Sequence, residues 1–204
     1  MIDIIDEVTY VLPESNYIKT ECVKNKIILC HSGSSDMKHF LKWTTRLNGK
    51  YQKTAAYSID VSGKIYQHFE PENASMLMGD PEIDKSSIII VLDNEGWLSR
   101  EIENPGFSNW IGYIYDQTDK IVERKWREQT YWAPYTQEQF DSAADLVNML
   151  CFEFSIPNVV VPHNTKLDDL DFDGVLYRSN FEKHYTDLSP AWLFKEFKDR
   201  VEKI

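Results

Sequence analysis

Two unbroken apolar runs constrain the fold more than any other feature of the chain. Residues 27–30 and 88–92 contain only isoleucine, leucine, valine and cysteine. Strands that are covered on both faces have this pattern, whereas strands with one solvated face alternate apolar and polar residues. Helices must then cover the sheet, and Gln137–Cys151 carries apolar residues at helical spacing behind a Thr136–Gln139 capping box. We therefore expect an α/β protein with a central mixed β-sheet flanked by helices.

The chain is expected to form one domain. Its 204 residues suffice for a single hydrophobic core, and no repeat, low-complexity tract or linker interrupts them. We place the domain at residues 1–204, with its core at about 17–197. The segment at about 103–133 is rich in aromatic residues and shows no regular period, so it is expected to be an irregular insertion.

Charge and composition exclude several partners. The net charge of −11 disfavours a nucleic acid, since binding to phosphates requires basic surface. No apolar stretch is long enough to span a bilayer, so no membrane partner is expected. The N-terminal residues lack a basic leader and an extended apolar segment, which indicates synthesis in the cytoplasm without a signal peptide. The three cysteines lack metal-ligand spacing and are expected to be reduced thiols.

Two histidines occupy similar places in the sequence. His31 closes the first apolar run, His163 closes the short run Val159–Val161, and Asp187 lies in a turn shortly before Pro190. A lone histidine after a strand is more often a packed, hydrogen-bonded residue than a ligand. Two imidazoles and one carboxylate, however, are a set typical of a catalytic zinc with one open position. His68, on the arm of a hairpin, is instead expected to be a surface or hydrogen-bonded histidine.

Five segments carry a family likeness. They are His31–Gly33, the hairpin Ala55–Gln67, the strand and turn Ser87–Gly96, Tyr135–Gln139 and Val161–Asn164. In this order they resemble the zinc-dependent N-acetylmuramoyl-L-alanine amidases, bacterial and phage enzymes that share a fold with the animal peptidoglycan recognition proteins. The likeness implies the same central mixed sheet flanked by helices.

The resemblance also implies a site. It places one Zn²⁺ ion between His31, His163 and Asp187, with His184 as the alternative third ligand. It implies a peptidoglycan muropeptide as the substrate, cleaved between N-acetylmuramic acid and L-alanine. In such a site the zinc polarises the amide carbonyl and lowers the pKa of a bound water molecule. One ligand turn departs from the family, because Pro162 stands where its members have glycine.

The residues that would transfer protons depart further from the family. Positions at which its enzymes carry a glutamate, a tyrosine and a lysine correspond here to Val91, Ala55 and Tyr185. Valine and alanine cannot accept or donate a proton. Tyr185, Asp93 and Glu95 are therefore the candidates for this part of the reaction.

Substrate contacts are expected from two segments. Most aromatic residues of the segment 103–133 are expected to pack beneath it, but Trp132 and Tyr135 are interpreted as a platform for a sugar ring or a peptide. Arg178 and Asn180, in an insertion ahead of Asp187, are expected to add polar contacts.

Three functions remain open. The chain is an amidase with shifted proton-transfer residues, a catalytically weakened module that binds the cell wall, or a structural component of a phage particle with phage structural proteins as partners. The first is favoured, because three ligand types are hard to retain in the right order without a metal. The place of action is then the cell wall or, for the third function, the phage particle.

Overall fold

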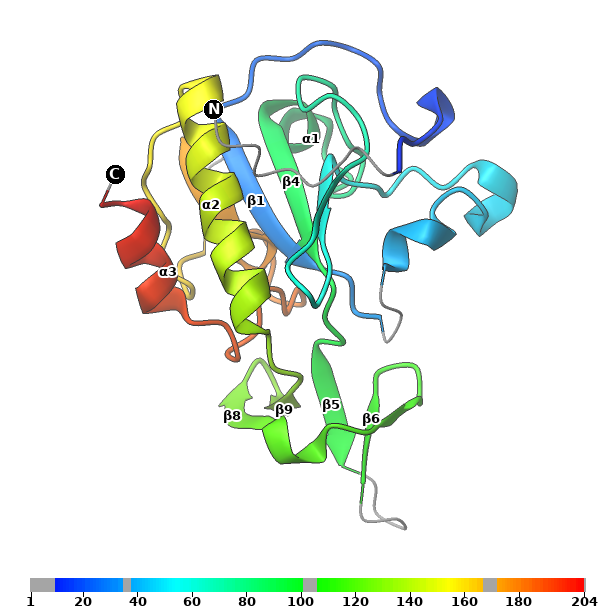
Figure 1. Cartoon of the computed structure of the whole chain (residues 1–204), viewed down its shortest axis with the longest axis vertical. Coiled ribbons are helices and arrows are strands. Elements are labelled where there is room, and N and C mark those ends of the chain that lie inside the picture. Colours follow the sequence, from blue (N-terminus) through cyan, green and yellow to red (C-terminus); the bar gives the residue numbers. More distant parts are fainter. Residues whose placement is uncertain (1–9, 35–37, 101–105, 167–171, 204) are drawn as a thin grey trace.

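The computed structural model describes residues 10–34, 38–100, 106–166 and 172–203. Its centre is a five-stranded mixed sheet in the order β10, β1, β4, β2, β3 (Figure 1). The strands are β1 (Lys26–His31), β2 (Tyr57–Ile59), β3 (Ile65–Gln67), β4 (Ser87–Leu92) and β10 (Gly174–Tyr177). All neighbouring pairs are parallel except β2 and β3. The expected central mixed sheet is therefore confirmed.

The two apolar runs lie side by side at the centre of this sheet. β4 pairs with β1 along its whole length, from Lys26 opposite Ser87 to His31 opposite Leu92. Every residue of β4 is buried, as are the first five of β1. Because β1 and β4 are parallel, their carboxyl ends, with His31 at one of them, meet at the same edge of the sheet.

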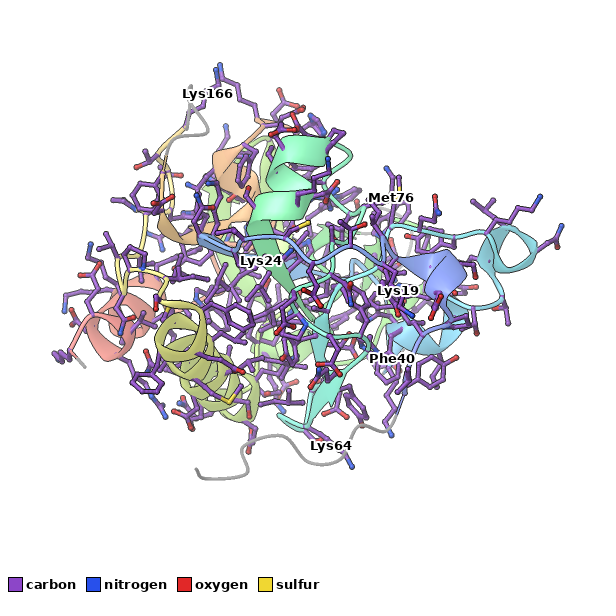
Figure 2. The ribbon with its side chains drawn as sticks, turned by 90° about the horizontal axis from the view of Figure 1, so that it is seen from above. Lys19, Lys24, Phe40, Lys64, Met76 and Lys166 are labelled. Atoms are coloured by element: carbon purple, nitrogen blue, oxygen red, sulfur yellow. The ribbon has the colours of Figure 1, made fainter. Side chains whose placement is uncertain are left out.

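Helices cover the sheet as the sequence predicts. The α-helices are α1 (Pro81–Ser86), α2 (Gln137–Phe154) and α3 (Phe194–Val201), and views from two directions place α2 and α1 on opposite sides of the sheet (Figures 1 and 2). The capping box at Thr136 and Gln139 is formed, which confirms where α2 begins. Arg200 of α3 forms ion pairs with Asp141 and Asp145 of α2, so the two helices are joined by charge as well as by apolar contacts.

Short 3₁₀ helices lie in the connecting segments. They are η1 (Glu14–Asn16), η2 (His39–Lys42), η3 (Arg46–Gly49), η4 (Thr118–Lys120) and η5 (Arg178–Asn180). None of the described helices is both long and apolar enough to cross a membrane.

The aromatic segment is a second sheet, which corrects the expectation of an irregular insertion. Its antiparallel strands are β5 (Trp97–Arg100), β6 (Phe107–Asn109), β7 (Ile114–Tyr115), β8 (Val122–Trp126) and β9 (Gln129–Trp132). They lie beyond the carboxyl end of β4 (Figure 1). The strands are too short to show alternation. The β8–β9 turn also has positive φ at Arg127 and Glu128, where the usual hairpin signal is Asn-Gly.

His68 is buried and fully hydrogen-bonded, in agreement with one of the two expectations for it. Its Nε2 lies 2.8 Å from Ser58 Oγ and its Nδ1 lies 3.0 Å from the carbonyl oxygen of Tyr10. Burial lowers the pKa of His68 to about 4, against the opposing effect of the Tyr10 carbonyl. The folded protein therefore keeps this ring neutral at pH values at which the unfolded chain protonates it.

We predict that His68 contributes to loss of stability in acid. Since the folded pKa lies below the unfolded value of 6.5, protons bind preferentially to the unfolded chain between pH 6.5 and about 4. The free energy of unfolding of the wild type, relative to His68→Gln, should fall by about 3 kcal/mol from pH 7 to pH 4. Urea unfolding of both proteins at several pH values measures this difference. An unchanged difference would show that His68 is protonated in the folded state.

Candidate active site

A pocket at the carboxyl end of β1 brings several candidate residues together. It has a volume of about 190 Å³ and is lined by His31, Glu95, Arg178, Tyr185 and Asp187, among others. These side chains come from three places: the end of β1, the β4–β5 connection, and the segment between β10 and α3. Ligands commonly bind at the carboxyl ends of parallel strands, where loops from distant parts of the chain converge. We call this cavity the β1 pocket.

His31 is held on two sides. Its Nδ1 lies 3.1 Å from Tyr135 Oη, and its backbone N–H donates to Asp187 Oδ2 at 3.3 Å. Burial lowers the pKa of His31, while Asp187 acts in the opposite direction. The ring is therefore neutral at pH 7, and Nε2 is the nitrogen that Tyr135 leaves for a proton or a ligand. Gly96 allows this placement, because its φ is +77° and a Cβ there would lie 2.9 Å from His31 Cε1.

Tyr135 lies behind His31. The sequence predicted that Tyr135 would contact the substrate, and it does line a cavity next to the β1 pocket. Its hydroxyl bonds to His31 and accepts from the Ser189 N–H at 3.4 Å. Its ring packs edge-on against Trp192, and burial raises its pKa. Its place in the structure is therefore that of a residue that orients His31.

Asp187, Arg178 and Tyr185 form one group at the pocket. The Asp187 side chain is buried, and Arg178 Nη1 lies 3.8 Å from its Oδ2. The Arg178 guanidinium also stacks over the Tyr185 ring at 3.9 Å from the ring centre. A buried carboxylate beside a guanidinium keeps a charge of each sign at the pocket.

Arg127, which the sequence did not single out, holds this segment in place. Its guanidinium donates to the carbonyl oxygens of Ser179, Glu182 and Tyr185. The β8–β9 turn thereby fixes the backbone ahead of Asp187. The sequence gives no signal for this contact, because an arginine in a surface turn is ordinarily solvated.

The two acidic candidates for proton transfer lie in different environments. Glu95 lines the β1 pocket, accepts a hydrogen bond from Asn109 Nδ2 at 2.8 Å, and has its pKa raised by burial. Asp93 does not line that pocket; it lies buried against His39 and accepts from the backbone N–H of Lys38. This corrects the expectation that Asp93 acts beside His31.

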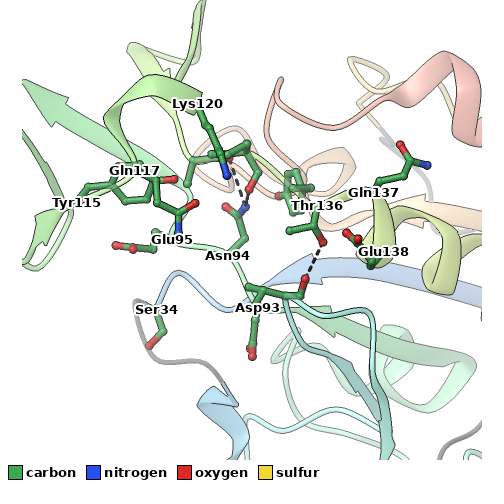
Figure 3. A pocket seen from close by; sticks show the side chains of 14 residues that line it. Ser34, Asp93, Asn94, Glu95, Tyr115, Gln117, Lys120, Thr136, Gln137 and Glu138 are labelled. Atoms are coloured by element: carbon green, nitrogen blue, oxygen red, sulfur yellow. Dashed lines mark hydrogen bonds between the residues drawn. The ribbon is translucent and has the colours of Figure 1, made fainter.

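A neighbouring cavity of about 440 Å³ lies at the N-terminal end of α2 (Figure 3). Glu95 and Lys120 line it from the side of the second sheet, and Thr136 and Glu138 line it from α2. The Asn94 side chain donates to the carbonyl oxygens of Ala133 and Pro134, which ties the turn after β4 to the end of the second sheet. The cavity shares Glu95 with the β1 pocket, so the two spaces adjoin there.

His163 lies apart from the β1 pocket. Val160 bridges to Val175 of β10, and β10 pairs with β1 on its other side, so β10 separates the His163 segment from β1. Two strand spacings correspond to about 10 Å. The His163 ring stacks on Phe194 at 3.7 Å, and its Nε2 lies 3.2 Å from the carbonyl oxygen of Leu188. Burial lowers the pKa of His163 to about 4.

The donor set that the resemblance implies is therefore not assembled. Across residues 10–34, 38–100, 106–166 and 172–203, no three histidine, cysteine, aspartate or glutamate side chains are placed to hold one metal ion. His31 and Asp187 share the β1 pocket, whereas His163 does not line it. The alternative ligand His184 does line it, but its Nδ1 pairs with Glu182 at 2.9 Å. As placed, these side chains do not fit a three-ligand zinc site.

Two of the expected substrate contacts are core residues instead. The Trp132 side chain has no exposed surface, and its Nε1 donates to the carbonyl oxygen of Arg124. Asn180 is equally buried and donates to the carbonyl oxygens of Pro162 and Thr165. Neither can contact a ligand in this conformation, which corrects both expectations. Arg178 does line the pocket, and so does Trp110, which is 56% exposed.

Comparisons with known proteins agree on one family. The family model for N-acetylmuramoyl-L-alanine amidase matches residues 22–171, which is more than half of the chain. No curated protein sequence matches. Several solved structures do match in fold. The amidase LysC from Clostridium intestinale URNW is 11% identical, with a TM-score of 0.53 over 95% of this chain and 97% of that one.

Two further structures have the same fold. AmpD is 13% identical, with a TM-score of 0.57 over 98% of each chain. The amidase AmiD from E. coli, solved with anhydro-N-acetylmuramic acid-L-Ala-D-gamma-Glu-L-Lys, is 14% identical. Its TM-score is 0.56, over 89% of this chain and 59% of that one. At such identities the likeness shows the fold alone, but the family model matches the sequence itself. The chain belongs to the N-acetylmuramoyl-L-alanine amidase family.

Proposed function

We propose that this protein hydrolyses the amide bond between N-acetylmuramic acid and L-alanine in muropeptides of peptidoglycan, and that it does so in the β1 pocket. The observation that carries the proposal is the convergence of a half-buried neutral imidazole, His31, with Asp187 and Arg178 at the carboxyl end of β1. Family membership supports the reaction type. Since the substrate is a cell-wall polymer, the proposed place of action is the cell wall.

The residues of the pocket provide groups for both proton transfers. Water adds to the lactyl carbonyl carbon and the C–N bond breaks, so one proton leaves the water and one joins the amine. His31 is the proposed acceptor, through Nε2. The Glu95 carboxyl, whose pKa is raised by burial, is the proposed donor to the leaving nitrogen. The Arg178 guanidinium supplies positive charge near the carbonyl oxygen as negative charge develops there.

No step is assigned to zinc here, because the described side chains, as placed, do not fit the three-ligand site that the family resemblance implies. Tyr185 is assigned to the positioning of Arg178, on whose guanidinium its ring stacks. Metal analysis of the purified protein tests the resemblance on this point. The family resemblance implies about one zinc ion per chain.

Mass spectrometry of digested muropeptide tests the proposed reaction. The probe is N-acetylmuramic acid-L-Ala-D-γ-Glu-L-Lys, and the expected products are the free sugar acid and the intact tripeptide. New reducing sugar ends from polymeric peptidoglycan would instead indicate a glycosidase, which needs a suitably spaced pair of carboxyl groups. Binding without products would support a binding module, which is the alternative that the sequence left open.

We predict that Tyr135→Phe lowers turnover about tenfold, because groups that orient an active-site histidine typically contribute about 10–100-fold. The substitution removes only the hydroxyl that holds His31 Nδ1. Tyr10→Phe is the matched control, since its hydroxyl bonds to Thr44 outside the β1 pocket. The kcat values of both variants on the same muropeptide measure the effect. Equal kcat values for Tyr135→Phe and the wild type would show that the hydroxyl does not orient the catalytic ring.

A further inference from the structure

A second cavity adjoins the β1 pocket on the side of η2 and η3. It has a volume of about 100 Å³ and shares His31, Ser32 and Arg178 with the β1 pocket. Its other polar lining includes His39, Arg46 and Lys53. A group bound there would therefore be continuous with a substrate whose amide bond lies against His31. We call this space the η2 cavity.

The η2 cavity is positively charged in an acidic protein. Arg46, Lys53 and Arg178 line it, and none of its described lining residues is an aspartate or a glutamate. The chain as a whole has a net charge of −11. Asp187 offsets part of the Arg178 charge, but it does so from the β1 pocket. Arg46 and Lys53 are exposed lining residues, and no described carboxylate forms an ion pair with either, so the field there favours an anion.

Two residues that line the η2 cavity each carry a buried nitrogen atom without a hydrogen-bond partner. His39 Nε2 and Arg178 Nε are both buried, and neither has a partner within the described residues. His39 is 5% exposed. A buried polar group without a partner is costly, so such atoms in a native protein usually indicate a bound water, ion or ligand group.

The His39 ring cannot turn to satisfy its free nitrogen. Its Nδ1 bonds to the buried carboxylate of Asp93, whose other oxygen accepts from the Lys38 backbone N–H. Trp43 packs edge-on against the ring at 5.2 Å. An ionised carboxylate only accepts hydrogen bonds, so Nδ1 carries a proton, and Nε2 at the other edge of the ring donates to an anion when the ring is an imidazolium with both nitrogens protonated.

The valine at position 91 also affects which ligands the η2 cavity can bind. The family resemblance places a glutamate at this position, and Val91 lines the η2 cavity together with His39. A glutamate there would repel a bound anion at close range, whereas valine leaves the positive side chains unopposed. The replacement that removes a proton-transfer group therefore also makes the cavity suitable for an anion.

We propose that the η2 cavity binds a carboxylate of the substrate, through the side chains of Arg178, His39, Arg46 and Lys53. This inference rests on the proposed function. The muropeptide seen with AmiD contains D-γ-Glu, and the γ linkage leaves the α-carboxylate of that residue free. Only L-alanine lies between the lactyl amide and D-glutamate, and these two residues together span about 7 Å. The cavity would thus select muropeptides with a free D-glutamate carboxylate over those in which it is a carboxamide.

A competition digest tests this selectivity. The protein receives an equimolar mixture of N-acetylmuramic acid-L-Ala-D-γ-Glu-L-Lys and the same compound with an α-carboxamide. The product ratio, measured by mass spectrometry, equals the ratio of the two kcat/KM values. The wild type should prefer the carboxylate by about tenfold, as expected for a charge-assisted hydrogen bond. The ratio is internal to each sample, so partial unfolding of a variant does not change it.

Three variants complete the test. Lys53→Gln and His39→Gln should bring the product ratio close to one. Lys195→Gln removes the same charge from the exposed face of α3 and should leave the ratio unchanged. Lys53 is exposed, so its substitution is compatible with folding even if His39→Gln is not. A ratio near one in the wild type, or one unchanged in Lys53→Gln, overturns the proposal.

A titration with inorganic phosphate covers the case in which neither compound is cleaved. That outcome contradicts the proposed function but leaves the anion site open to measurement. Saturable phosphate binding that shifts the NMR signals of the His39 ring, and that Lys53→Gln weakens while Lys195→Gln does not, supports the site. Absence of binding to the wild type overturns it. If instead both compounds are cleaved without preference and phosphate still binds, the substrate carboxylate is excluded as the ligand of the cavity.

Discussion

Replacing His31 with alanine is expected to lower kcat on the muropeptide by about 10²–10⁴-fold, the usual contribution of a positioned acid–base group. Desolvation keeps His31 neutral, and the Tyr135 hydroxyl orients its ring. The other described histidine of the pocket, His184, pairs with Glu182 instead. Turnover by the purified variant, measured by mass spectrometry, gives the size of the loss.

The fold should survive this substitution. His31 lies at the last position of β1, after the five residues that are buried in the sheet. Its loss leaves the Tyr135 hydroxyl without one partner, which costs about 1 kcal/mol. Thermal unfolding followed by circular dichroism checks this, and metal analysis of the same sample shows whether zinc content depends on His31. Unfolding of the variant would indicate a structural role, and activity within tenfold of the wild type would remove His31 from the reaction.

Replacing Trp132 with alanine is expected to lower the free energy of unfolding by about 3–5 kcal/mol, as for other large-to-small changes in a core. The indole is fully buried, lies 5.7 Å from the Trp126 ring, and donates its N–H to a backbone carbonyl. Alanine would leave a cavity between these groups and an unsatisfied acceptor. Urea unfolding at pH 7 measures the loss.

Trp110→Ala is the matched control for Trp132→Ala. Both tryptophans belong to the segment that forms the second sheet, but Trp110 is exposed and lines the β1 pocket. Its replacement should change stability by less than about 1 kcal/mol and raise KM instead, because an aromatic face at a pocket contributes to ligand binding. If Trp132→Ala raised KM without loss of stability, Trp132 would be the substrate platform that the sequence suggested.

The central sheet and its longest helix could be predicted because their signals are local. The apolar runs of β1 and β4 are long enough to be unambiguous, and the Thr136 capping box marks the start of α2 within one turn. Such signals depend on a few adjacent residues and do not require knowledge of the partner strand. His31 followed directly, since a residue that closes a buried parallel strand must lie at the sheet edge where ligands bind.

The second sheet could not be predicted, because its strands are stabilised by one another. β7 has two residues and β6 has three, so neither carries a period of its own. For the same reason the sequence predicted that Trp132 would be a platform for a ligand. Whether a tryptophan is a platform or a core residue depends on what packs over it, and that is set by strands distant in sequence.

The sequence alone determined the residue types at the site, and the tertiary structure decided their roles. Burial keeps His31 neutral, and the packing of the turn after β4 places Glu95 at the β1 pocket and Asp93 against His39. His163 has the same local pattern as His31, yet β10 separates its segment from β1. A pattern within one segment specifies that a histidine ends a strand, but which groups face it depends on the order of strands in the sheet, and that order is a property of the whole chain.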